Sequence, residues 1–483
     1  MAPLDRSSDV PLADQIESRL AALIASGQLP TGARLSSIRA LASQLSVSPN
    51  TVVTAYDRLV ARGLVETRGT AGFFVAESNA PEALPSQLEA GEAHDAVWLA
   101  QQAHDQRASL LPASSGALPV SWLEDAIPAA VVQRGLARSV GGMAARCPPQ
   151  GMPELRERIA MLMRGQGIAV DASRVLSCYG GTHAIDLICR AFLKPGDAVL
   201  VETPGYHLLF DRLREAGVKM IGIARRHDGI DLDQLEAACI EHRPRLLFIQ
   251  SVLHNPTGWG SSAANLHRVL MLAERHHLLL AEDDVHGHFL GGPHAGSVTR
   301  LAQLAELRGV VYYSSFCKAL SPALRVGYMA AEPTLLKALL RAKIQSVLTT
   351  ATLNENVLLE LLASGRFRKH LDRLQQKLAA ARQVSTRALR GAGLLLDRPA
   401  EGGLFLWGEL PAGVDADTLV KDAYRQHILL AGAAFDVANA DQRHLRFNVV
   451  HAQHPRLAEF LSQRWQASSQ AQQLIRRAAE RSR

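Results

Sequence analysis

Hydrophobic residues near the start of the chain recur at the spacing of amphipathic helices. An apolar stripe at i, i+4, i+7 and i+8 begins at Ile16, and a second stripe covers residues 38–45. Ser48-Pro49 predicts the start of a third helix, because serine caps helices and proline suits the first helical position. Residues 63–75 predict a two-stranded hairpin with a glycine-rich tip. Together these elements predict a mainly α-helical winged helix-turn-helix domain over residues 9–77.

The polar residues of this domain suit a DNA-binding surface. Short polar side chains at the start of the third helix can contact base edges, while arginines can hold phosphates. Between residues 34 and 75, five arginines stand against two acidic residues, a net charge of +3. A small module that binds another protein is the alternative, but helices, cap, hairpin and charge agree on DNA. The candidate DNA-binding residues are Arg34, Ser37, Arg39, Ser48, Asn50, Thr51, Thr54, Arg58 and Arg68.

The hydrophobic pattern changes after this domain. Residues 78–115 open with a polar, proline-containing stretch that predicts a linker. Residues 116–345 are expected to form a large domain in which helical patterns alternate with apolar runs. Near-continuous apolar strands separated by helices are typical of an α/β fold with a largely parallel sheet covered on both faces. The predicted strands are residues 175–177, 198–201, 246–249, 278–281 and 310–313.

The residues that follow these strands are candidates for a binding site, since ligands of parallel sheets lie beyond the strand ends. Gly181-Thr182 lies in a glycine turn that enters a helix, which suits a phosphate. Tyr206 follows the second run and offers a ring that can stack on a heteroaromatic ligand. Asn255 follows the third run, where its amide can bind a phenolic oxygen, and Asp283 follows the fourth, where a carboxylate suits a ring nitrogen.

The fifth run leads to Lys318, between Ser315 and Arg325. A lysine at the end of a buried strand is costly unless its amine is used. One use is a Schiff base to an aldehyde cofactor, whose phosphate Ser315 and Arg325 would then suit. The alternative is a surface lysine after an edge strand, and spacing alone does not decide between the two.

Two family resemblances follow from these motifs. Residues 32–42, 47–52 and 55–59 resemble the signature of the GntR superfamily of bacterial repressors. Ser36 stands where a proline is usual and Pro49 where an arginine is usual, so the operator is expected to differ from the family norm.

The ordered set of glycine turn, aromatic residue, Asn-Pro-Thr-Gly, acidic pair and Ser-x-x-Lys resembles fold-type-I pyridoxal 5′-phosphate (PLP) aminotransferases. This resemblance makes Lys318 the Schiff-base lysine and Asp283 the partner of the pyridine nitrogen. It also implies that Arg446 clamps a substrate carboxylate. The other cofactor contacts that it implies are Asn255 at the phenolic oxygen, Tyr206 on the ring, and Gly181, Thr182, Ser315 and Arg325 at the phosphate.

Two residues depart from the aminotransferase pattern. A tyrosine usual after the acidic pair is replaced by Val285-His286, so either His286 takes over its contact with the phenolic oxygen or that contact is lost. Arg146 stands where a tyrosine that reaches the neighbouring subunit's phosphate is usual. Both departures weaken the case for fast catalysis. A zinc site is a weaker alternative, because its candidate ligands show no tetrahedral set: His276, His277, His286 and His288.

The C-terminal segments and the overall composition limit the possible classes of protein. Residues 346–466 resemble the small α+β domain of aminotransferases, and residues 467–483 form a basic tail. The chain has 20% charged residues, no apolar run of membrane length, no signal-peptide pattern and no CxxC pair among five cysteines. We therefore expect a cytoplasmic protein, whose net charge of +6 permits a nucleic-acid partner.

A GntR-type head joined to an aminotransferase-like body resembles the MocR subfamily of transcription regulators. The resemblance implies a head-to-tail homodimer in which PLP, or its adduct with a small amine or amino-acid effector, alters operator binding. The alternative is a working PLP-dependent aminotransferase with an accessory head. A DNA-binding protein with a vestigial body is a third hypothesis, which the intact Lys318 and Asp283 disfavour.

Overall fold

The computed structural model describes two units, which are treated separately below. The first is the head, Met1–Ser86, and the second is the body, Gln87–Arg483. None of the helices within the described ranges is long and apolar enough to cross a membrane. The described residues are 11–25, 29–30, 32–61, 64–67, 72–76, 96–104, 110–138, 144–291, 298–396, 402–438, 441 and 443–465.

The head is a winged helix-turn-helix, as predicted. Its helices are α1 (Leu12–Ala25), α2 (Ile38–Leu45) and α3 (Pro49–Ala61), and its hairpin is β1 (Val65–Thr67) with β2 (Phe73–Val75). The predicted apolar stripes form one core in which Ile16, Val52, Tyr56 and Leu59 are fully buried. Ser46 makes the tight turn between α2 and α3 in a left-handed conformation, and its N–H donates to the carbonyl of Ala42.

The wing contains a third extended segment that the hydrophobic pattern does not reveal. Arg34 forms a β-bridge with Phe74, next to the antiparallel pairing of β1 and β2. The N–H of Leu35 donates to the carbonyl of Phe73 at 2.9 Å, and the N–H of Val75 donates to that of Ala33 at 2.8 Å. The hydroxyl of Tyr56 on α3 donates to the carbonyl of Ser36 at 2.7 Å, which ties this segment to the helices.

The body is built on one sheet of eight strands in the order β3-β10-β9-β8-β7-β4-β5-β6. The five predicted runs are β3 (Val175–Cys178), β4 (Ala198–Thr203), β7 (Leu246–Ile249), β8 (Leu279–Asp283) and β9 (Val310–Ser315). Neighbours from β9 through β8, β7 and β4 to β5 (Lys219–Arg226) are parallel. The antiparallel exceptions are β10 (Gly327–Ala330), between β3 and β9, and β6 (Gly229–Ile230), beside β5.

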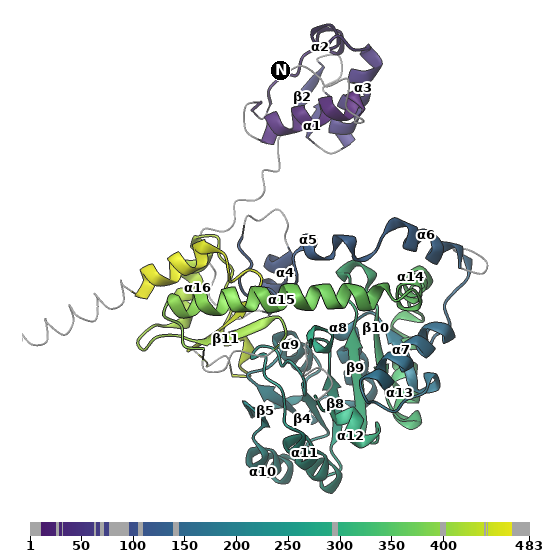
Figure 1. The fold of residues 1–483 in the computed structure, drawn as a ribbon, viewed down its shortest axis with the longest axis vertical. Coiled ribbons are helices and arrows are strands. Elements are labelled where there is room, and N and C mark those ends of the chain that lie inside the picture. Colours follow the sequence, from purple (N-terminus) through teal and green to yellow (C-terminus); the bar gives the residue numbers. More distant parts are fainter. Residues whose placement is uncertain are drawn as a thin grey trace, which may run out of the picture. The chain divides into compact units, whose positions relative to one another are not determined.

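Helices cover both faces of this sheet, as the apolar runs predict (Figure 1). Alternate residues of a strand enter different cores: Leu200 belongs to one hydrophobic cluster, whereas its neighbours Val199 and Val201 belong to another. One cluster includes α8 (Gly181–Phe192), α9 (His207–Glu215) and α13 (Pro333–Val347). The other includes α7 (Pro153–Gly165), α10 (Leu232–His242), α11 (Ala263–Arg275), α12 (Leu301–Ala305) and α14 (Thr352–Ala363).

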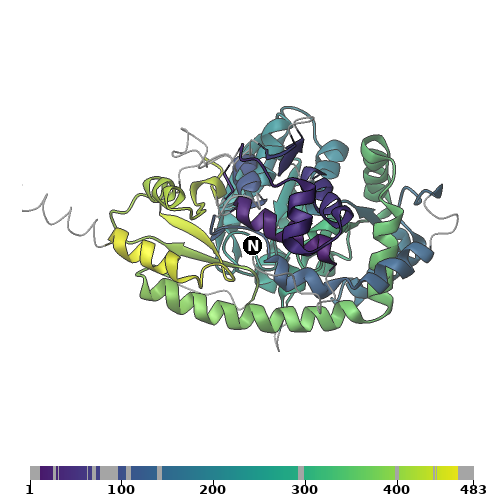
Figure 2. The ribbon, with the colours of Figure 1, turned by 90° about the horizontal axis from the view of Figure 1, so that it is seen from above.

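A smaller C-terminal domain packs beside the sheet and has its own core. Helix α15 (Arg366–Gly391) runs along the body from α14 to this domain (Figures 1 and 2). The domain also contains α16 (Ala416–Arg425) and the antiparallel pair of β11 (Phe405–Glu409) and β12 (His444–Asn448).

The end of the predicted linker belongs to this small domain, which corrects the boundary at residue 115. Ala113 is fully buried, its carbonyl accepts from the N–H of Asn448 at 2.7 Å, and Leu111 forms a β-bridge with Ile428. These partners are distant in sequence, so no local pattern reveals them. The same predicted linker contains α4 (Ala96–His104), while residues 77–95 and the tail from 466 lie outside the described residues. Two further helices of the body are α5 (Val120–Leu123) and α6 (Ala129–Ala137).

Candidate cofactor site and DNA-binding surface

One cavity of about 230 Å³ lies at the strand ends of the body, where the small domain meets the sheet. The predicted cofactor residues come from the ends of five different strands or the turns after them, and all of them line this cavity. They are Gly181, Thr182, Tyr206, Asn255, Asp283, His286, Ser315, Lys318 and Arg325, joined by Arg446 from β12.

Lys318 faces this cavity and is not a surface lysine. Its side chain is half-buried and lines the cavity. This burial, with the nearby guanidinium of Arg446, lowers the pKa of Lys318 to about 8. Within the described residues its amine has no hydrogen-bond partner, and a Cβ built on Gly116 would lie 3.5 Å from it. A partly neutral, unpartnered amine in a cavity suits attack on a carbonyl group.

A compact cradle for an anion lies beside this lysine. Gly180, at a φ of 87°, precedes α8, so the first N–H groups of that helix open toward the cavity. A Cβ built on Gly180 would lie 3.3 Å from the hydroxyl oxygen of Ser315 and 3.5 Å from a guanidinium nitrogen of Arg325. Arg325 is held in place because its guanidinium donates to the carbonyl of Tyr179 at 2.7 Å. Helix N–H groups, a hydroxyl and a guanidinium therefore converge, as a phosphate requires.

Asp283 ends β8 at the far wall of the cavity. Burial raises its pKa to about 6, although the N–H of Val285 donates to its carboxylate at 2.9 Å. The polar side chains of Gln250 and Tyr313 act in the opposite direction and lower that pKa. A cationic partner in the cavity would keep this carboxylate ionised.

Arg446 is held more firmly than its sequence context indicates. Its guanidinium lies between the rings of Phe405 and Phe435, 4.5 and 4.3 Å from their centroids. It donates to the side-chain oxygen of Asn255 at 2.8 Å and to the carbonyl of Ser114. Burial lowers the pKa of Arg446 to about 9. Because the Oδ1 of Asn255 accepts from Arg446, the amide NH₂ of Asn255 is left to donate into the cavity.

The histidines of this region divide into separate groups. His286 lines the cavity against the edge of Phe405, and burial lowers its pKa to about 3, so its imidazole is neutral. His288 stacks on Phe316 instead, and His276 and His277 follow α11 at the other end of β8. The structure therefore does not bring together the four histidines considered for zinc, and no three potential ligands gather elsewhere in the described ranges.

Several cavity residues escaped prediction. Gln250 directly follows β7, so the rule that singled out the other strand ends would also have found it. Phe405 lies in a run assigned only to the small domain. Phe435, Ser114 and Leu99 reach the cavity from segments without a strand pattern, and no sequence signal marks them.

Some of the candidate DNA-binding residues of the head are exposed, whereas others have structural roles. Arg34, Arg39, Asn50 and Thr54 are exposed, and Thr51 is half-buried. These residues are available to DNA.

The two serines cap helices. Ser37 accepts from the N–H of Ala40 at 3.2 Å, and Ser48 accepts from that of Thr51 at 3.1 Å.

Arg58 is exposed, and its guanidinium is paired with Asp14 on α1 and lies 3.8 Å from Glu17. We therefore propose that it contributes to helix packing in place of the predicted phosphate contact. Arg68 lies outside the described residues.

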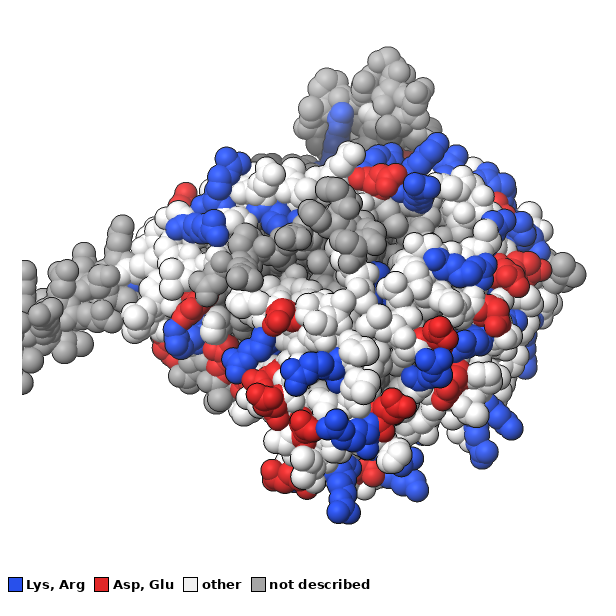
Figure 3. Space-filling model, turned by 60° about the horizontal axis from the view of Figure 1, so that its bottom comes forward, with Lys and Arg blue, Asp and Glu red and all other residues white. Residues whose placement is uncertain are grey.

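On the face of the molecule in Figure 3, basic and acidic side chains are interspersed.

Comparisons with known proteins define the class of both units. Residues 110–462 match aminotransferase class I and II, and residues 12–75 match the gntR family of bacterial regulatory proteins. The body is therefore an aminotransferase-like domain of a fold whose relatives use PLP, and the head is a GntR-type DNA-binding domain.

Relatives share both parts. The chain is 30% identical to the uncharacterized HTH-type transcriptional regulator YdcR of Escherichia coli, over 90% of this chain and 94% of that protein. It is 29% identical to the probable rhizopine catabolism regulatory protein MocR of Rhizobium meliloti, over 80% of this chain and 78% of the relative. Among solved structures, α-aminoadipate aminotransferase LysN from Thermus thermophilus, complexed with N-(5′-phosphopyridoxyl)-L-leucine, is similar, with 28% identity, a TM-score of 0.66 and coverage of 73% and 91%.

The chain belongs to the MocR-type regulators, in which a GntR head is fused to an aminotransferase class I and II body.

Proposed function

We propose that this regulator holds PLP in the cavity of its body and that a small amine or amino acid, by binding there, alters the affinity of the head for its operator. The observation that carries the proposal is the convergence of an unpartnered lysine, an anion cradle and a buried carboxylate in one cavity. Their arrangement fits PLP, whose aldehyde, phosphate and pyridine nitrogen need these three groups. When bound, PLP draws electrons from the α-carbon of an attached amine.

Each wall of the cavity has a separate task in this proposal. Lys318 binds the aldehyde, while Gly181, Thr182, Ser315 and Arg325 hold the phosphate. Asp283 keeps the ring nitrogen protonated, and Tyr206 stacks on the ring. The amide of Asn255 and the neutral imidazole of His286 face the phenolic oxygen. Arg446, whose Nε has no hydrogen-bond partner within the described residues, binds an effector carboxylate.

Helix α4 offers a route from the cavity toward the head. Leu99 and Ala100 line the cavity, and Leu99 packs in a small core with Leu429 and Phe435. Helix α4 is the first described element of the body after the chain leaves the head. An effector that contacts Leu99 therefore acts on the helix that follows the linker. This helix can transmit the coupling free energy between the cavity and the DNA-binding head.

The test is operator binding by the full-length protein with and without PLP and candidate amines. We expect PLP to give a visible absorbance band that Lys318→Ala abolishes, and effective amines to change operator affinity roughly 5–150-fold. Leu99→Ala should keep the band but shift the amine concentration that is needed. Val97, on the same helix and half-exposed, is not a cavity residue, so Val97→Ala is the matched control. Operator affinity that is indifferent to PLP and amines would contradict the proposal.

A working aminotransferase is the second candidate, favoured by the joint presence of Lys318, Asp283 and Arg446 in one site. Turnover also requires release of a keto acid and regeneration of the cofactor with a second substrate. We expect this turnover to be slow or absent, because His286 stands in place of the usual tyrosine. Rapid release of keto acid over many turnovers, measured on the same preparation, would favour the enzyme.

We also propose a homodimer, with each head against the partner's body. Three exposed apolar residues, Ile344, Val347 and Leu348, lie at the end of α13. This end adjoins the phosphate side of the cavity: the carbonyl of Thr349 accepts from the hydroxyl of Tyr179, whose own carbonyl accepts from Arg325. A second copy that covers these residues would support the cradle from outside.

A further inference from the structure

Gln250 lines the cavity and contacts two of its other lining residues. Its side-chain oxygen accepts from the N–H of Asn255 at 2.7 Å, and its side chain interacts with the carboxylate of Asp283, which lines the same two cavities and whose pKa it lowers. An amide group has one accepting end and one donating end, so these two contacts fix its orientation. Gln250 therefore links the residue at the proposed phenolic-oxygen contact to the residue at the proposed ring-nitrogen contact.

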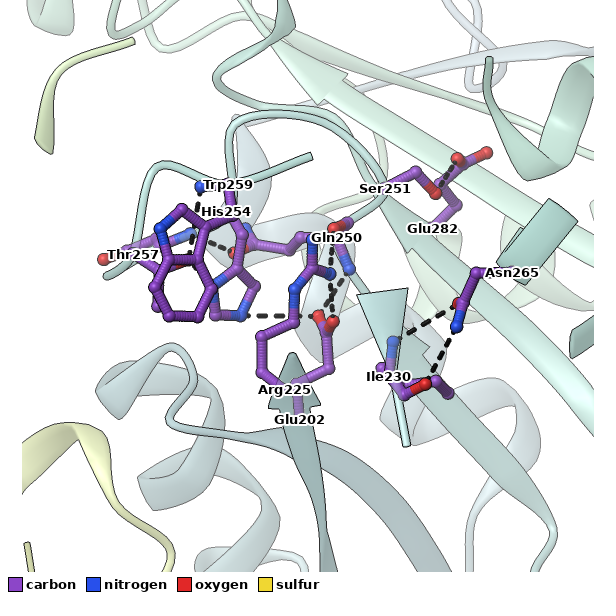
Figure 4. A network of polar contacts seen from close by, with 11 residues as sticks. Glu202, Arg225, Ile230, Gln250, Ser251, His254, Thr257, Trp259, Asn265 and Glu282 are labelled. Carbon is purple, nitrogen blue, oxygen red and sulfur yellow. Dashed lines mark hydrogen bonds and ion pairs between the residues drawn. The ribbon is translucent and has the colours of Figure 1, made fainter. Parts of the chain in front are cut away.

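A buried ion pair holds the backbone of Gln250 (Figure 4). Its N–H donates to Glu202 at 2.7 Å, and its carbonyl accepts from the guanidinium of Arg225 at 3.0 Å. The same guanidinium nitrogen donates to Glu202 at 2.5 Å. Glu202 is 4% exposed and the side chain of Arg225 is fully buried.

This ion pair lies where the hydrogen bonding between two strands ends, so side chains must hold the backbone at that point. Strands β4 and β7 are paired up to Val201 and Phe248. Beyond that point the side chain of Glu202 takes over the bonding to the backbone of Gln250, just where the chain turns toward the cavity. A buried ion pair is a poor source of stability, because desolvation offsets its attraction. Its place at this backbone therefore indicates a positioning role.

We propose that Gln250 is a positioning residue that orients Asp283 and Asn255 toward the cofactor, and that the Glu202–Arg225 pair acts through Gln250. The inference rests on the proposed cofactor contacts of Asp283 and Asn255. It adds residues that act through Asp283 and Asn255 and in this way set how strongly the cofactor is held.

The side chain of Gln250 favours the ionised form of Asp283, so its loss raises the pKa of that carboxyl further above its usual range. A protonated Asp283 no longer pairs with a protonated ring nitrogen, so PLP binding weakens below this pKa. Substitution of Gln250 does not alter the identity of the other titratable or charged groups that line the two cavities around Asp283. These groups are Glu202, Tyr206, His207, His254, His286, Tyr313, Cys317, Lys318, Arg325 and Arg446, with Asp284 adjacent.

The experiment measures the dissociation constant of PLP for the full-length protein between pH 5 and pH 8. Gln250→Leu is expected to raise that constant about tenfold or more and to move upward the pH below which binding weakens. Gln250→Glu keeps an acceptor for Asn255 but adds a negative charge beside Asp283, so the pH midpoint should move further.

Asn265 supplies the matched control. It is 7% exposed, as Gln250 is, and its amide bonds the backbone of Ile230 in the same part of the sheet (Figure 4), away from the cavity. Asn265→Leu should leave both affinity and pH midpoint unchanged. A Gln250→Leu variant that behaves like Asn265→Leu would overturn the inference.

The role of the ion pair is tested by its joint removal, Glu202→Gln with Arg225→Leu, which leaves no unpaired buried charge. If the pair acts through Gln250, this double variant should weaken PLP binding, and adding Gln250→Leu should weaken it little further. Fully additive losses would show that the pair acts independently. The thermal unfolding midpoint checks that each variant is folded.

Two further variants keep this inference separate from the proposed function. Lys318→Ala and Asp283→Asn should both weaken PLP binding. If neither does, the proposed function fails. If both do while the Gln250 variants match the wild type, only the positioning role fails.

Discussion

Lys318 and Arg446 show how strongly the surroundings alter single residues. Both are cations in the same cavity, and burial lowers the pKa of Lys318 to about 8 and that of Arg446 to about 9. Arg446 is compensated by two aromatic rings and two hydrogen bonds. Lys318 has no such contacts within the described residues, and because an amine has a lower ordinary pKa than a guanidinium, Lys318 gives up its proton more readily than Arg446.

The lowered pKa of Lys318 predicts how the rate of PLP uptake by the PLP-free protein changes as the pH rises. Only the neutral amine attacks an aldehyde, so the uptake rate should increase through a midpoint near pH 8, the pKa of Lys318. Arg446→Gln removes a positive charge that lowers this pKa, so the midpoint should move to higher pH. Stopped-flow absorbance measures the rate. Arg382→Gln, at a buried arginine of α15 bonded to Gly403, is the control and should leave the midpoint in place. An equal shift in both variants would contradict the assignment.

At the scale of elements, the head illustrates how packing reassigns residues that look alike in the sequence. The sequence predicts that Arg39 and Arg58 both hold phosphates. Arg39 is exposed on α2, whereas Arg58 on α3 is paired with Asp14 on α1. We therefore expect the same charge to contact DNA in one helix and to pair with a neighbouring helix in the other.

The two arginines should respond differently to substitution. Arg39→Ala is expected to weaken binding to all DNA sequences and to lower the salt dependence by about one ion, because one phosphate contact is lost. Arg58→Ala should leave the salt dependence nearly unchanged and destabilise the head by at most about 1 kcal/mol, since this pair is exposed. Asn50→Ala should instead change sequence preference.

Fluorescence anisotropy at several salt concentrations measures the DNA effects, and Asp14→Ala is the control for the ion pair. If Arg58→Ala lowers the salt dependence as much as Arg39→Ala, while Asp14→Ala does not, Arg58 is a phosphate ligand after all.

At the scale of the whole molecule, the proposed dimer makes a prediction about assembly and cofactor together. Leu348→Asp places a charge among the exposed apolar residues at the end of α13, so we expect the dimer to weaken toward the mass of one chain. PLP affinity should fall with it, because this end adjoins the phosphate cradle through Tyr179. Light scattering after size exclusion measures the mass.

Ile240 on α10 is 65% exposed and provides the control, Ile240→Asp, which should remain a dimer. A wild-type protein with the mass of a single chain would contradict the dimer directly. A Leu348→Asp dimer with normal PLP affinity would place the interface elsewhere.

Much of the fold and of the site could be predicted because local sequence patterns indicate the helices, the strands and the residues at the strand ends. Helical stripes defined α1 to α3, and five apolar runs defined strands of the sheet. Parallel strands end at one edge, so the residues that follow them meet in space even though more than 130 positions separate Gly181 from Lys318. The sequence by itself therefore determined both classes of domain and the cavity residues at the strand ends.

Only the tertiary structure decided the remaining contacts. The pairing of Arg58 with Asp14, the enclosure of Arg446 by Phe405 and Phe435, and the hold of Glu202 and Arg225 on Gln250 join residues without any common period or motif. The same holds for residues 110–115, whose partners lie more than 300 positions away. Hydrophobic periodicity reports which way a side chain faces within its own element, but a polar partner is chosen only when distant elements pack together.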